Sequence, residues 1–129
     1  MNRWNIPEWL EREVIERDSH CVYCGVEFAA PNASRRDSPS WEHIINDARI
    51  ITRENVARCC VGCNASKGAK NLGDWLESKY CRARGITRDS VASVVRSALV
   101  TEREKGLPVR PTNGPTAVPR SVGQREGVA

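Results

Sequence analysis

The feature that most constrains this chain is a repeated pair of cysteines, each with two residues between its members. The first pair is Cys21 and Cys24, and the second is Cys60 and Cys63. A C-x-x-C turn places two thiols on the same side of the backbone, and two such turns can surround a tetrahedral zinc ion at about 2.3 Å from each sulfur. The sequence therefore predicts a zinc site that closes the intervening residues into a loop.

The alternative to a zinc site is a set of four unrelated thiols in a small core. The chain has 129 residues and no apolar run long enough to cross a membrane, and its N-terminus lacks the apolar core of a secretory signal. We therefore expect a cytoplasmic protein, in which paired cysteines are more often metal ligands than disulfides. A domain of this length buries a modest core, so a metal would add stability.

Three further residues leave the ligand set open. Cys59 could replace Cys60, although its spacing to Cys63 is less usual for a zinc knuckle. Cys81 has no partner at knuckle spacing and is expected to be a small buried apolar residue. His20 adjoins the first pair, and we expect it to be packed or exposed. Four cysteine ligands leave no open position for water or substrate, so this zinc is predicted to be structural.

Apolar periodicity and turn residues predict an α+β domain over residues 1–106. We expect flanking helices over 7–17, 73–84 and 88–105, with Gly85 closing the second and Thr87 or Asp89 capping the third. The remaining residues, 107–129, are rich in Pro and Gly and are expected to form a flexible tail.

The segment between the cysteine pairs predicts a hairpin. Residues 40–45 form an apolar, β-branched run, followed by a turn at 46–48 and a partner strand at 49–52. We expect residues 52–60 to form a turn or the start of a helix, and a further helix to begin after Cys63.

This hairpin carries two residues with useful chemistry, Glu42 and His43. A carboxylate binds hard cations such as Mg²⁺, and an imidazole with a pKa near ~6.5 accepts a proton from water at neutral pH. Hydrolysis of a phosphodiester uses both a base and a cation. Each residue alone has a simpler explanation: Glu42 as an exposed strand residue, His43 as a packed histidine, and Asn55 and Asn64 as helix caps.

Taken together, these residues resemble the HNH endonuclease family. The chain has, in order, C-x-x-C, Glu-His, Asn and C-x-x-C-Asn-x-x-Lys-Gly, all between Cys21 and Lys70. The resemblance implies a small ββα-metal, treble-clef-like core over about 20–72, in which a helix crosses a β-hairpin and a divalent cation lies between them. In this chain a zinc site of four cysteines would staple that core.

The resemblance also implies roles for four residues. His43 matches the general base, and Glu42 matches the acidic residue that often precedes it and binds the catalytic cation. Asn55 matches the middle asparagine, which braces the hairpin loop and so orients the histidine. Asn64 stands where the family often has histidine, facing the cation. A carboxylate with an amide oxygen favours Mg²⁺ or Mn²⁺.

Strand geometry restricts how these roles can be combined. Neighbouring residues on a flat strand point to opposite faces, so Glu42 and His43 can serve one site only where the strand twists or ends.

We therefore expect a metal-dependent endonuclease that hydrolyses phosphodiester bonds of DNA, in a bacterial cell or a phage-infected host. The net charge of +4 suits a polyanionic partner. Candidate phosphate contacts, each of which could instead be ordinary surface charge, are Arg35, Arg36, Arg49, Arg53, Arg58, Lys67 and Lys70. The alternative is a non-catalytic zinc-ribbon-like module that binds nucleic acid or protein. It accounts for the four cysteines and the charge, but not for Glu42, His43 and Asn64 together.

Overall fold

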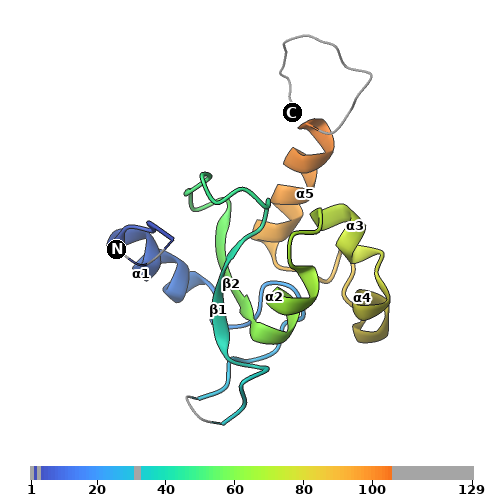
Figure 1. Ribbon diagram of the computed structural model, residues 1–129, viewed down its shortest axis with the longest axis horizontal. Coiled ribbons are helices and arrows are strands. Elements are labelled where there is room, and N and C mark those ends of the chain that lie inside the picture. The colour runs from blue at the N-terminus through green and yellow to red at the C-terminus, as the bar shows by residue number, and fades with distance from the viewer. Residues whose placement is uncertain (1, 3, 31–32, 106–129) are drawn as a thin grey trace.

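The computed structural model describes residues 2, 4–30 and 33–105, which form a small α+β fold (Figure 1). The expected tail at 107–129 lies outside the described residues. The elements in chain order are α1 (Glu8–Arg17), β1 (Pro39–His43), β2 (Val56–Cys60), α2 (Val61–Lys67), α3 (Leu72–Leu76), α4 (Lys79–Arg84) and α5 (Ser93–Lys105). Among these residues, no helix combines the length and the apolar character that crossing a membrane requires.

The two strands form an antiparallel sheet whose register runs from Pro39 opposite Cys60 to His43 opposite Val56. Helix α1 lies on one side of the strands and α2 on the other (Figure 1). Alternation along β2 sends Val56 into an apolar cluster with the buried residues of α1, and Ala57 into the larger cluster with α2, α3 and α5. The sheet is therefore covered on both faces.

The predicted hairpin partner at 49–52 is wrong, and so is the turn or helix start expected at 52–60. β1 pairs instead with Val56–Cys60, and residues 44–55 form the connecting loop. The physical reason is burial. Four of the five residues of β2 are buried, whereas Ile50 and Ile51 are only half-buried. Pairing with β2 therefore removes more apolar surface from water.

Three of the predicted helices begin or break at different places. The helix expected to begin after Cys63 begins at Val61, because Cys60 is its N-cap and the Cys60 side chain accepts a hydrogen bond from the Cys63 N–H. The helix expected over 73–84 is interrupted at Ser78, whose hydroxyl accepts a hydrogen bond from the Cys81 N–H at 3.3 Å and caps α4. The helix expected from residue 88 begins at Ser93, because Thr87 Oγ1 accepts hydrogen bonds from Asp89 and Ser90 in a separate turn. α1 agrees with its prediction to within one residue.

Gly85 ends α4 as the sequence predicts. It has a φ of 68°, in the left-handed region that favours glycine.

A single side chain braces the loop between the strands. Asn55 is 2% exposed, and its Oδ1 accepts a hydrogen bond from the Ile45 N–H at 2.7 Å. Its Nδ2 donates to the carbonyls of Ile45 and Ile50, both at 3.2 Å. The loop therefore leaves β1 and returns to β2 around one buried amide.

We predict that Asn55→Ala destabilises the fold by about 2–3 kcal/mol, because it leaves half-buried backbone groups at Ile45 and Ile50 without their hydrogen-bond partner. Urea denaturation measures the free energy of unfolding. Asn46→Ala is the matched control in the same loop, since Asn46 is exposed and its side chain donates a single long bond within the described part of the chain, at 3.4 Å to the Ala69 carbonyl. Equal effects of the two substitutions would show that Asn55 does not brace the loop.

Candidate functional site

The four cysteines of the two pairs come together at the end of the sheet where β2 is followed by α2. Their Sγ atoms all lie within 4.8 Å of one another, and those of Cys24 and Cys60 are 3.8 Å apart. Ligands about 2.3 Å from a tetrahedral zinc ion are separated by about 3.8 Å. The cluster could therefore hold a zinc ion, as the spacing predicts.

Backbone hydrogen bonds shape both turns around their first sulfur. Cys21 Sγ accepts from the N–H groups of Tyr23 and Cys24, and Cys60 Sγ accepts from the Cys63 N–H, each at 3.4 Å. Hydrogen bonds from the thiols of Cys60 and Cys63 lower the pKa of Cys21, whereas burial raises the pKa of Cys24. Hydrogen bonds to Cys21 and Cys60 also raise the pKa of Cys63. The thiolate, the form that binds a metal, is therefore favoured at Cys21 but not at Cys24 or Cys63.

The structure separates the other candidates from this cluster. Cys59 is buried, and its Sγ lies 3.7 Å from Ser40 Oγ, so Cys60 is the member of the second pair. Cys81 is also buried and lies outside the cluster, in agreement with its prediction as a small apolar residue. His20 is exposed and shares a 2.9 Å hydrogen bond with Ser19.

Glu42 lies inside the fold and is 7% exposed. The Tyr23 hydroxyl donates to its Oε2 at 2.5 Å, and Lys67 Nζ lies 3.1 Å from the same oxygen. Burial raises the pKa of Tyr23, and the charge of Glu42 raises it further, so Tyr23 keeps the proton that it donates. Glu42 is therefore held by one neutral donor and one cation.

His43 is the last residue of β1 and has different neighbours. Its ring meets that of Trp4 edge-on, with centroids 5.6 Å apart. Its Nε2 is buried and has no hydrogen-bond partner among the described residues. Burial lowers the pKa of His43, which opposes the raising effect of Glu42 and Asp47. The neutral imidazole, the form that can accept a proton, is therefore favoured.

Asn64 joins helix α2 to strand β1. Its Nδ2 donates to Ser40 Oγ at 2.9 Å and to the Trp41 carbonyl at 3.1 Å. Both bonds use the amide nitrogen, and among the described residues no hydrogen bond is recorded for the amide oxygen of this half-buried side chain. The same helix supplies Lys67, about one turn further on. Helix α2 thus contacts β1 through Asn64 at Ser40 and Trp41, and through Lys67 at Glu42.

Lys67 lies elsewhere than the sequence suggested. Both expectations, a phosphate contact and a solvated lysine, place its side chain at the surface, but it is 1% exposed. Sequence reasoning also missed Tyr23 as a partner of Glu42. The available signals were the position of Tyr23 inside the first C-x-x-C turn and the three-residue step from Asn64 to Lys67, which places both on one face of a helix.

The other basic candidates are exposed or half-buried, and several have partners. Arg49 forms an ion pair with Asp47 at 2.8 Å. Arg53 pairs with Glu13 on α1 and also lies over the Trp9 ring, with its Cζ 5.7 Å from the ring centroid. Arg58 is half-buried, with its Cζ over the rings of both Phe28 and Trp41. The remaining exposed candidates are Arg35, Arg36 and Lys70.

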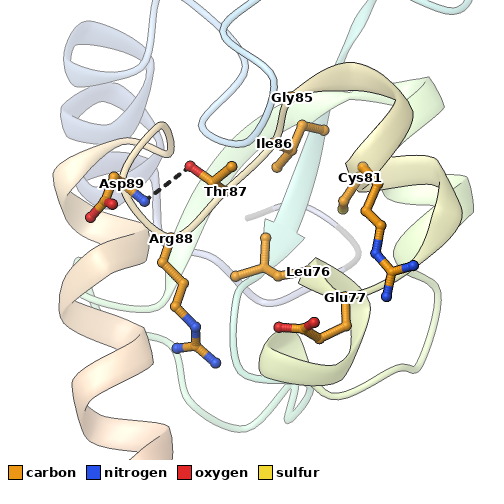
Figure 2. A pocket seen from close by; sticks show the side chains of 9 residues that line it. Leu76, Glu77, Cys81, Gly85, Ile86, Thr87, Arg88 and Asp89 are labelled. Atoms are coloured by element: carbon orange, nitrogen blue, oxygen red, sulfur yellow. Dashed lines mark hydrogen bonds between the residues drawn. The ribbon is translucent and has the colours of Figure 1, made fainter.

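A separate hollow of about 470 Å³ lies beside α4 (Figure 2). Its wall includes Leu76, Cys81 and Ile86, with the side chains of Glu77 and Arg88 at its edge. None of the cysteines of the cluster lines it, and neither do Glu42 or His43. It is therefore distinct from the candidate site.

Comparisons of the chain with protein-family models, with curated proteins and with solved structures return no match.

We predict about one tightly bound zinc ion per chain, which Cys60→Ser loses and Cys59→Ser keeps. The two cysteines are adjacent and both buried, but only Cys60 belongs to the cluster. Elemental analysis of purified protein measures the zinc content, and thermal denaturation measures the accompanying loss of stability. Folded wild-type protein without zinc, or equal zinc loss in the two variants, would contradict this assignment.

Proposed function

We propose that this protein is a metal-dependent endonuclease that hydrolyses phosphodiester bonds of DNA, with a ββα core like that of the HNH family. The observation that carries the proposal is the arrangement of β1, β2 and α2. This unit brings Glu42, at the end of β1, next to a helix that carries Asn64 and is anchored by Cys60 and Cys63. The order of elements and residues is the one that the sequence resemblance implies.

The donor atoms near Glu42 fit a hard divalent cation. A carboxylate and an amide oxygen are the ligand types that Mg²⁺ and Mn²⁺ prefer, and Mg²⁺ is commonly bound by one or two carboxylates together with water and substrate phosphate. Both hydrogen bonds recorded for the Asn64 side chain among the described residues use its amide nitrogen, so its amide oxygen is available as a ligand. Glu42 and Asn64 would hold the cation, which would stabilise the charge that develops on the phosphate oxygens.

In this proposal His43 accepts the proton of the attacking water. Its lowered pKa keeps the imidazole neutral at neutral pH, as a base requires. Asn55 sets the path of the chain immediately after His43, since the Ile44 N–H donates to the Asn55 carbonyl at 2.9 Å and the Ile45 N–H to its side chain. Asn55 therefore orients the base through the backbone and does not take part in the chemistry.

We predict that His43→Ala lowers the rate of DNA cleavage by roughly 10²–10⁴-fold, the usual effect of removing a general base. The measurement is nicking of a supercoiled plasmid with Mg²⁺, and with EDTA in its place. His20→Ala is the matched control, because it removes the other histidine of the chain, which is exposed. Cleavage by His43→Ala at the wild-type rate would refute the mechanism and favour the non-catalytic zinc-ribbon-like module.

Glu42→Gln tests the cation site separately from the base. Glutamine keeps an acceptor for Tyr23 and Lys67 but removes the negative charge, so it should weaken cation binding. It also leaves the buried Lys67 ammonium without a counter-charge, so we expect a lower melting temperature, and cleavage is measured below that temperature. We predict that the Mg²⁺ concentration needed for half-maximal cleavage rises and that part of the lost rate returns at higher Mg²⁺. A rate that is lost equally at every Mg²⁺ concentration would argue against Glu42 as a ligand.

A further inference from the structure

Lys67 is the most unusual charged residue in the described part of the chain. Its side chain is 1% exposed, and that of its partner Glu42 is 8% exposed. A buried ammonium group is costly unless it is paired, and the only ion pair recorded for Lys67 among the described residues is with Glu42. Its position therefore has to be explained by the charge of Glu42.

Packing holds this lysine in place from both ends. Lys67 is the last residue of α2, a helix that begins next to Cys60 and includes Cys63 of the metal cluster. At the other end of the side chain, Lys67 Nζ contacts Glu42 Oε2, the oxygen that also accepts a hydrogen bond from the Tyr23 hydroxyl. The Tyr23 ring is itself buried and meets Trp75 edge-on, with centroids 4.9 Å apart. Neither partner of Glu42 is thus a flexible surface group.

This geometry has a consequence for any cation that binds Glu42. The carboxylate carries one negative charge, which the Lys67 ammonium already balances. A divalent cation at the same carboxylate would add two positive charges within a few ångströms of that ammonium, in a region of low dielectric where repulsion is strong. Lys67 and the divalent cation therefore act against each other at Glu42.

We propose that Lys67 is a built-in counter-cation of Glu42, which stabilises the buried carboxylate without metal and lowers the affinity of the site for divalent cations. This rests on the proposed function for the identity of the site, and it assigns Lys67 a role that acts through Glu42, as a positioning residue. It also explains why Lys67 lies away from solvent. To contact a DNA phosphate, the Lys67 side chain would have to leave its ion pair with Glu42.

The test is equilibrium binding of Mn²⁺ to the zinc-loaded full chain, without DNA, followed by the electron paramagnetic resonance signal of free Mn²⁺. Lys67→Met removes the charge and keeps an unbranched apolar side chain, so we expect Mn²⁺ to bind at least roughly tenfold more tightly than to wild type. Adding Glu42→Gln to this variant should abolish the gain, because the carboxylate is the shared ligand.

Three control variants separate charge from packing. Lys79→Met removes the same charge from an exposed lysine at the start of α4 and should leave Mn²⁺ affinity unchanged. Tyr23→Phe removes the neutral donor of Glu42 without changing any charge, so it should not tighten Mn²⁺ binding. Lys67→Arg keeps the charge and should bind Mn²⁺ like wild type or more weakly.

Thermal denaturation gives a second readout. Without its ammonium partner, the buried carboxylate is uncompensated, so Lys67→Met should melt at a lower temperature than wild type, and Mn²⁺ should raise its melting temperature more than that of wild type. If Lys67→Met is unfolded without Mn²⁺, added Mn²⁺ should restore its folded circular dichroism spectrum. Failure of Mn²⁺ to stabilise or refold this variant would overturn the proposal.

The outcomes distinguish the two proposals. Unchanged or weaker Mn²⁺ binding by Lys67→Met overturns the counter-cation role, even if the wild type cleaves DNA with a requirement for His43. Tighter binding in a protein that does not cleave DNA supports the counter-cation role and rejects the nuclease. No Mn²⁺ binding by either protein overturns the counter-cation role, and cleavage assays of His43→Ala then decide the function separately.

Discussion

The gathering of four thiols from two distant segments is the constraint on which the candidate site depends. Tyr23 lies between Cys21 and Cys24, and helix α2 begins immediately after Cys60. Because both segments meet at the cluster, the hydroxyl of Tyr23 and the ammonium of Lys67 reach the same oxygen of Glu42. A metal held by the four sulfurs would therefore stabilise more than the turns that bind it, since it would also position both donors around the carboxylate.

The register between β1 and β2 provides the second constraint. His43 pairs with Val56 at the end of the sheet, and the loop that follows turns around the buried amide of Asn55. Glu42 and His43 are neighbours in the chain but contact different parts of the fold, as strand alternation requires. Because the strand ends at His43, the next residues can turn away, which brings the loop and both side chains to the same end of the sheet.

The buried ion pair of Glu42 and Lys67 restricts the chemistry that is possible at the end of β1. A carboxylate buried beside an ammonium is stabilised only while the pair stays together, and a second cation changes that balance. In the proposed cation site, Lys67 would lower the affinity of Glu42 for a divalent cation. In the same region, burial lowers the pKa of His43, so a neutral base can exist next to a charged pair. A cation site and a neutral base are the two components that the proposed hydrolysis of phosphodiesters requires.

The sequence by itself determined the features that depend on a few adjacent residues. The C-x-x-C spacing predicted the cysteine cluster, and periodicity with Pro7 predicted α1, because knuckles and helix starts are set by local geometry. Only the tertiary structure decided that β1 pairs with Val56–Cys60, and that Lys67 is buried against Glu42. Both depend on contacts between residues far apart in the chain, and the solvent exposure of a side chain is a property of the whole fold.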